Sequence, residues 1–299
     1  MKYGIIDIGS NTIRMVMYRV FDGRIEYLLN SKIIAKLANY IEDGMMKIEG
    51  VTVLIDAINT HKELASHHDL DNLRYFATAP LRVRNADQVL SAVKQATGED
   101  INILSGEQEA RCGVAGISYN FDLSDCICMD LGGGSLEITM IKDEKIINAV
   151  SLDIGSVSVT KHMVEGILPT DKEIAMIKKA VIEKLKDVAW LNKSAFDIAY
   201  LVGGSARSMM KMHKYYENSK QDLHGYRIFT SDISNIYTQL TRSQIDGIRL
   251  IDQHCPGRLF TFVPGLIILQ TALEYLNTPL VRLSQFGVRE GCLINYVIL

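Results

Sequence analysis

Asp7-Ile8-Gly9-Ser10-Asn11-Thr12 and Asp130-Leu131-Gly132-Gly133-Gly134-Ser135 are two similar turns that decide how this chain is expected to fold. Each turn ends a short apolar run, and two further runs of β-branched and bulky residues follow it. This order predicts a three-stranded antiparallel meander in each copy. Asp130 lies 123 residues after Asp7, so the sequence predicts an internal duplication at the scale of a domain.

Helical spacing of apolar residues and short apolar runs predict the remaining elements. Ser105 and Gln108 have the spacing of a capping box, which predicts a helix beginning at about Gly106. We expect strands over 3–8, 13–20, 24–29, 73–77, 101–104, 125–130, 136–141, 146–152, 198–202 and 280–283, and helices over 51–67, 87–96, 106–117, 157–165, 171–185, 206–215, 264–275 and 288–296.

Length and composition predict a two-domain α/β protein. The 299 residues fit a first domain over 1–120 and a second over 121–299, with the last helix either staying in the second or packing back on the first. The net charge of −3 excludes a generally basic nucleic-acid binder. No apolar run approaches the roughly 20 residues that span a bilayer. The five cysteines form no C-x-x-C pair, which indicates reduced, buried thiols rather than zinc ligands or disulfides.

The repeated turn has a chemical use. Glycine lets the backbone approach a ligand closely, and successive N–H groups can surround a phosphate. The aspartate before the glycines can hold a divalent cation. One such turn alone is more typical of a plain hairpin, but two at equivalent positions favour a grip on one phosphate chain from both domains. Gly203-Gly204-Ser205 adds a strand-to-helix turn of the same kind, for which ordinary helix entry is the alternative.

In this order, several motifs together resemble the exopolyphosphatase/guanosine pentaphosphatase (Ppx/GppA) phosphatase family, in a short two-domain form. The motifs are the two turns, Ser105–Ala110, Ala77–Arg82, Leu152–Val157, Val202–Ser205 and Gly287–Gly291. The family belongs to the actin-like ATPase superfamily. The resemblance therefore implies duplicated actin-like, RNase H-like domains with a cleft between them.

The resemblance implies a hydrolase that releases terminal orthophosphate from inorganic polyphosphate by Mg²⁺-assisted attack of water, with Mn²⁺ as an alternative ion. The alternative substrate is guanosine pentaphosphate (pppGpp). A sugar or acetate kinase of the same superfamily is a more distant alternative. Three assays distinguish these alternatives. Phosphate release from polyphosphate indicates the first, phosphate release from pppGpp indicates the second, and phosphate transfer from ATP to a metabolite indicates the kinase.

The resemblance also assigns roles to residues. Glu109 is implied as the general base and Arg82 as the arginine that holds the terminal phosphate. Asp130, Glu137 and Asp7 are implied as metal or water-orienting residues. Substrate binding is implied for Ser10, Asn11, Thr12, Arg14, Gly132, Gly133, Gly134, Ser135, Gly203, Gly204 and Ser205. Pro80, Gln108 and Leu136 depart from the common pattern, and Leu136 leaves one hydroxyl fewer in the site.

The residues themselves leave two questions open. Glu107 and Glu109 lie about 200° apart in the first turn of a helix, so only one of them can face a site, and the choice of Glu109 depends on the resemblance. Arg207, Lys211 and Lys214 share one helical face, which is either a solvated surface or a track for distal phosphates of a polyanion. We further expect a cytoplasmic protein, no membrane or nucleic-acid partner, and a homodimer as the commonest closed assembly.

Overall fold

The computed structural model describes residues 1–193 and 195–298 and divides the chain into two compact units. The first unit contains Met1–Glu109 together with the segment that begins at Cys292, and the second contains Ala110–Gly291. The sequence placed the boundary near residue 120, whereas the structure divides the chain inside helix α3 (Gly106–Ser118). The physical reason is that Val114 and Ile117 of α3 pack in a core cluster of the second unit.

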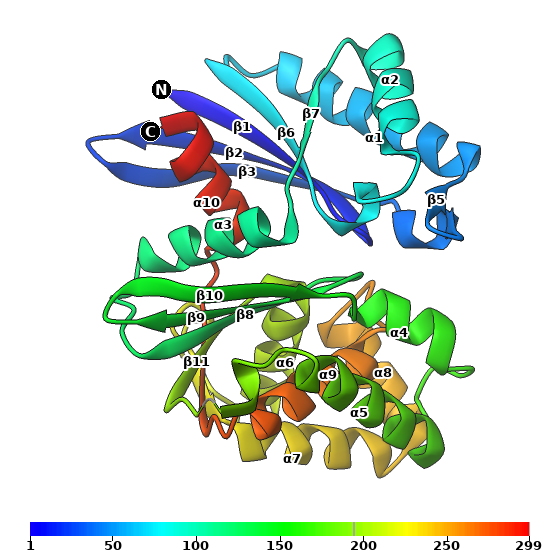
Figure 1. The fold of residues 1–299 in the computed structure, drawn as a ribbon, viewed down its shortest axis with the longest axis vertical. Coiled ribbons are helices and arrows are strands. Elements are labelled where there is room, and N and C mark those ends of the chain that lie inside the picture. The colour runs from blue at the N-terminus through cyan, green and yellow to red at the C-terminus, as the bar shows by residue number, and fades with distance from the viewer. Residues whose placement is uncertain (194, 299) are drawn as a thin grey trace. The chain divides into compact units, whose positions relative to one another are not determined.

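Among the described residues, the first unit is built on five strands in the order β3-β2-β1-β6-β7. Strands β1 to β3 form the predicted antiparallel meander, and β6 and β7 extend the sheet in parallel beyond β1. Ile6 and Ile8 of β1 are buried against helices α1 and α2, which lie on one side of this sheet (Figure 1). The bounds are β1 (Lys2–Ile8), β2 (Thr12–Phe21), β3 (Arg24–Ile34), α1 (Ile48–Ser66), β6 (Asn72–Ala77), α2 (Ala86–Thr97) and β7 (Ile101–Ile103).

The second unit repeats this plan on a larger scale. In the part of the chain that the structure describes, its sheet has six strands in the order β10-β9-β8-β11-β13-β12. Ile127 and Met129 of β8 face a core that includes α5, α6 and α9, whereas Cys126 and Cys128 face α3. The bounds are β8 (Cys126–Leu131), β9 (Leu136–Lys142), β10 (Lys145–Leu152), α4 (Ser156–Met163), α5 (Asp171–Lys186), β11 (Ile198–Val202), α6 (Gly203–Tyr216), α9 (Phe262–Tyr275), β13 (Leu280–Leu283), α10 (Val288–Leu293) and η4 (Ile294–Ile298).

The predicted duplication is confirmed at the level of single hydrogen bonds. The Gly9 N–H donates to the Thr12 carbonyl at 3.0 Å, and the Gly132 N–H donates to the Ser135 carbonyl at 2.9 Å. Both turns therefore close in the same way between the first and second strands of their meanders.

Some elements were missed by the sequence patterns. Helix α7 (Thr230–Thr241) is rich in Ser, Thr and Asn, which favour helices poorly, and it is held by burial of Ile233, Ile236 and Leu240. The helix expected over 206–215 already begins at Gly203, and the one expected over 288–296 is an α-helix to Leu293 that continues as the π-helix η4. The other missed elements are η1 (Leu37–Tyr40), β4 (Ile41–Glu42), β5 (Met45–Met46), η2 (Ala79–Leu81), η3 (Leu191–Lys193), β12 (Arg227–Phe229) and α8 (Gln244–His254).

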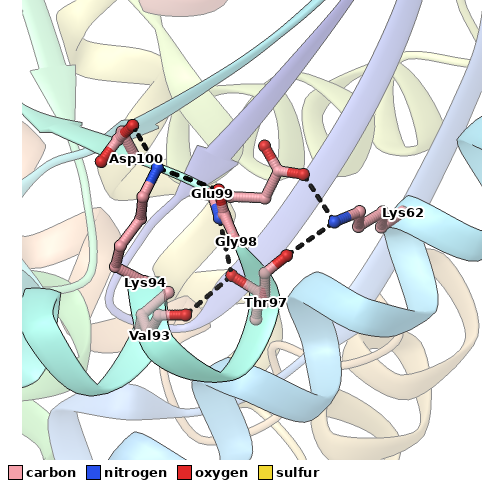
Figure 2. Close-up of polar contacts among 7 residues, drawn as sticks. All are labelled: Lys62, Val93, Lys94, Thr97, Gly98, Glu99 and Asp100. Carbon is pink, nitrogen blue, oxygen red and sulfur yellow. Dashed lines mark hydrogen bonds and ion pairs between the residues drawn. The ribbon is translucent and has the colours of Figure 1, made fainter.

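Two lysines fix the connection between α2 and β7 (Figure 2). Lys62 Nζ donates to the Thr97 carbonyl at 2.6 Å and pairs with Glu99 at 2.7 Å. Lys94 Nζ binds the Gly98 carbonyl at 3.0 Å and pairs with Asp100 at 2.6 Å. These contacts hold the start of β7, and the chain runs from β7 directly into the first turn of α3.

All five cysteines are buried and none forms a disulfide, as the sequence predicted. Met209, Met210 and Met212 are fully buried in the core of the second unit. Over the described residues, no helix combines the length and apolar character that crossing a bilayer requires.

Candidate active site

Glu109 and Arg82 form an ion pair in the first unit. Arg82 Nη1 donates to Glu109 Oε2 at 2.7 Å and to the Leu104 carbonyl at 3.2 Å. The Glu109 side chain is 9% exposed and the Arg82 side chain is 25% exposed. The Glu109 carboxylate is therefore largely removed from water and lies directly against the guanidinium of Arg82.

The first turn of α3 positions Glu109. The predicted capping box is confirmed, because the Ser105 hydroxyl accepts from the Gln108 N–H at 3.2 Å and Gln108 Oε1 accepts from the Ser105 N–H at 2.8 Å. Glu107 is exposed while Glu109 is buried. The structure therefore separates the two glutamates that the residues alone left open, and it is Glu109 that contacts Arg82.

The backbone of α3 packs closely against the backbone of the segment 287–291 in the second unit. A Cβ on Gly116 would overlap the Gly287 carbonyl, and a Cβ on Gly291 would overlap the Cys112 carbonyl. Glu290 is 3% exposed and accepts from the Gly287 N–H at 2.8 Å. The Gly-Val-Arg-Glu-Gly motif therefore brings α10 against the backbone of α3, which is a packing role.

The carbonyls of the first turn are bound from the segment that follows β3. The Ser10 carbonyl accepts from Ala38, and the Asn11 carbonyl accepts from Ala35 and Lys36, at 2.9 to 3.1 Å. In a trans peptide the C=O and the next N–H point in opposite directions. The N–H groups of Asn11 and Thr12 therefore point away from this segment. Arg14 lies beyond the turn on β2, where its Nη1 donates to Asn30 Oδ1 at 3.3 Å.

The second turn is held in the same manner by the start of α4. The Gly132 carbonyl accepts from Ser156 at 3.0 Å, and the Gly133 carbonyl accepts from Val157 at 2.9 Å and Ser158 at 3.0 Å. By the same peptide geometry, the N–H groups of Gly133 and Gly134 point away from α4. Adjacent N–H groups that point the same way can together donate to an anion.

Gly155 is required for this arrangement, which gives a first prediction. A Cβ on Gly155 would overlap the backbone of Gly133 and Gly134, which cannot move as a flexible side chain can. We expect Gly155→Ala to lower unfolding stability by about 1–3 kcal/mol and to lower phosphate release per folded molecule. The matched control is Gly166→Ala, because Gly166 is exposed and its nearest neighbour, the Leu168 carbonyl, would be 3.4 Å from the new Cβ. Melting curves and turnover on the same preparations test this, and equal turnover per folded molecule in both variants would contradict it.

Asp130 and Glu137 are directly opposed on neighbouring strands of the second unit. Glu137 is 3% exposed, and its Oε1 accepts from the Ser151 hydroxyl at 2.6 Å. Two carboxylates in this register repel each other. A hard divalent cation would remove that repulsion, and Mg²⁺ is commonly held by one or two carboxylates together with substrate phosphates. Among the described residues, no group of three or more His, Cys, Asp or Glu forms an all-protein metal site.

The first unit differs at the equivalent position. Asp7 is opposed by Arg14 where Asp130 is opposed by Glu137. The acidic pair of the second unit thus has a charge-balanced counterpart in the first. This difference favours the second unit for cation binding, and the metal role of Asp7 stays a prediction.

Gly203 and Gly204 make room for charged groups at the start of α6. Gly203 has φ +84°, and a Cβ there would overlap Asp130 Oδ1. A Cβ on Gly204 would overlap the guanidinium of Arg258, whose Nη1 donates to the Ser205 hydroxyl at 3.1 Å. No motif in the sequence singled out Arg258. It reaches this turn from a loop 53 residues further along the chain.

The geometry of each unit can be compared with known proteins. The sequence model of the Ppx/GppA phosphatase family matches residues 16–298. The chain belongs to the Ppx/GppA phosphatase family. Exopolyphosphatase 1 of Mycobacterium tuberculosis is 25% identical over 309 residues, covering 99% of this chain and 88% of that protein. A guanosine-5'-triphosphate,3'-diphosphate pyrophosphatase of Pseudoalteromonas atlantica is 28% identical over 296 residues, covering 97% of this chain and 57% of that protein.

Solved structures of Ppx/GppA proteins share the fold. The Aquifex aeolicus family member aligns with a TM-score of 0.81 at 24% identity, covering 100% of this chain and 98% of that chain. An exopolyphosphatase from Cytophaga hutchinsonii aligns with a TM-score of 0.85 at 19% identity, covering 98% and 97%. The fold class expected from the sequence, a duplicated actin-like α/β protein, is confirmed.

Proposed function

We propose that this Ppx/GppA phosphatase releases terminal orthophosphate from inorganic polyphosphate. The observation that carries the proposal is the Arg82–Glu109 pair, in which a buried carboxylate lies 2.7 Å from a guanidinium at the first turn of a helix. Phosphoryl transfer to water needs such a base, a cation for the developing charge and donors that hold the phosphate. Similarity to proteins named exopolyphosphatase over 99% of this chain supports polyphosphate as the substrate.

In this proposal the residues have separate roles in the reaction. A water oxygen forms a bond to the terminal phosphorus while the bridging P–O bond breaks. Glu109 accepts the proton that the water loses, and the shortened chain leaves with the bridging oxygen and its electron pair. Arg82 would stabilise charge on the terminal phosphate oxygens, and the N–H groups of the two turns would hold the phosphate chain. We propose that the residues of both units act on one substrate, which keeps the expected cleft as part of this proposal.

Mg²⁺ is the cation that the acidic pair fits. Asp130 and Glu137 would hold it through carboxylate oxygens, and bound Mg²⁺ would neutralise charge on the phosphate oxygens. The cytoplasmic location and the homodimer expected from the sequence stay predictions.

The second candidate is pppGpp 5'-phosphohydrolase activity. It is favoured by the 28% identity to a protein named as a guanosine-5'-triphosphate,3'-diphosphate pyrophosphatase. Both substrates end in the same phosphoanhydride, so Arg82 and Glu109 would serve either one. A sugar or acetate kinase is the more distant alternative, and the family assignment gives it no support.

Parallel turnover measurements test the proposal. We expect orthophosphate release from long-chain polyphosphate with a kcat/KM at least about tenfold above that for pppGpp and for ATP, a difference of about 1.4 kcal/mol in transition-state stabilisation. A higher kcat/KM for pppGpp would replace the proposal by the second candidate. Transfer from ATP to acetate or a sugar without release of orthophosphate would overturn both.

A further inference from the structure

One face of helix α6 carries positive charge without any negative charge. Arg207, Lys211 and Lys214 follow Gly204 at helical spacing and are exposed or half-buried. The opposite face is formed by Ala206, Met209, Met210 and Met212, which are fully buried. Helix α6 contains no aspartate or glutamate over its whole length. We call the face defined by Gly204, Arg207, Lys211 and Lys214 the α6 stripe.

A comparison with α5 shows that this composition is unusual even within the same unit. The polar face of α5 also carries several lysines, but it includes glutamates as well. Lys179 pairs with Glu183 at 3.8 Å, and Glu173 binds the N-terminus of its own helix through the Thr170 N–H at 2.6 Å. Mixed charge of this kind is typical of a solvated helix surface. The α6 stripe lacks it, and among the described residues neither the Lys211 nor the Lys214 side chain takes part in an ion pair or a hydrogen bond.

The α6 stripe begins at the turn already described. The Arg258 guanidinium occupies the space that a Cβ on Gly204 would fill. Lys211 and Arg258 both act on the Cys255 thiol, whose pKa is raised by burial while these two charges oppose the rise. Further along, Lys214 Nζ lies 5.8 Å from the centre of the Tyr226 ring.

We infer that the α6 stripe binds the distal phosphates of a linear polyanion whose terminal phosphate is being hydrolysed. This inference rests on the proposed function. With about 1.5 Å of rise per residue, the stripe extends roughly 15 Å from Gly204 to Lys214, which is long enough for several successive phosphate groups. A row of one charge sign attracts a polyanion without demanding a fixed register, because each cation can meet any phosphate. A short substrate that fills only the turns would gain nothing from the stripe.

The test compares two substrates in one enzyme. Steady-state rates are measured on tripolyphosphate and on long-chain polyphosphate for the wild type and for the double variant Lys211→Ala, Lys214→Ala. We expect the KM for long-chain polyphosphate to rise about tenfold, as two partly exposed charge contacts of ordinary strength would give. The kcat on both substrates and the KM for tripolyphosphate should stay within about twofold. Added salt should raise the long-chain KM more in the wild type than in the variant, because it screens the same contacts.

The matched control is Lys178→Ala, Lys179→Ala on α5, which removes the same net charge from the same unit. This control should leave the KM for long-chain polyphosphate unchanged. An equal rise in the control would overturn the inference, since general attraction to a positive surface would then explain the effect. Unchanged kinetics in the α6 variant would overturn it as well, while the proposed function would stand. If the wild type releases phosphate from neither substrate, both the proposed function and the inference fail.

Discussion

Glu109→Gln should lower kcat for phosphate release by about 10²–10⁴ while leaving substrate affinity nearly unchanged. The amide keeps the shape of the side chain and its place against Arg82, but it cannot accept the proton of the attacking water. Stopped-time phosphate assays under saturating substrate give kcat, and binding of polyphosphate to the inactive variant gives the affinity. The effect is among the largest expected because, among the described residues, Glu109 is the only buried carboxylate on helix α3.

Glu107→Gln is the control for this experiment. Glu107 belongs to the same helix turn and carries the same charge, but it is exposed. It should retain wild-type kcat, and both variants should keep the capping box that starts the helix. Retention of more than half of the wild-type turnover in Glu109→Gln would contradict the assignment, and a loss confined to Glu107→Gln would transfer the role to that residue.

Removing divalent metal should abolish activity completely, and adding Mg²⁺ or Mn²⁺ should restore it. Asp130 and Glu137 oppose each other across β8 and β9, so a cation that binds them should also stabilise the fold. We therefore expect Mg²⁺ to raise the melting temperature of the wild type in the absence of substrate. Glu137→Gln should lose this stabilisation and require more Mg²⁺ for half-maximal rate.

The control is Asp122→Asn, which removes an exposed carboxylate from the same unit. Its melting temperature should respond to Mg²⁺ as that of the wild type does. Full activity after exhaustive chelation would refute the metal role, whereas a melting response that survives in Glu137→Gln would place the ion elsewhere.

Local patterns predicted much of the fold. The meanders, the single strands after them and the capping box of Ser105 and Gln108 all depend on residues close together in the chain. The elements that were missed are short, or poor in helix-favouring residues, as α7 is. Their formation depends on burial of a few apolar side chains in a core contributed by distant segments, which no window of sequence contains.

The site shows the same division. The sequence by itself determined the duplicated turns, because glycine permits the tight local backbone turn that both copies adopt. It also marked Glu109 and Arg82 through a resemblance to known motifs. The ion pair between them joins residues 27 positions apart, and Arg258 reaches Ser205 from 53 positions away. Only the tertiary structure could decide these contacts. It also decided that Glu109 rather than Glu107 is buried, and that Gly155 packs against the backbone of Gly133. Each of these features depends on which surfaces close packing brings together rather than on local conformational preference.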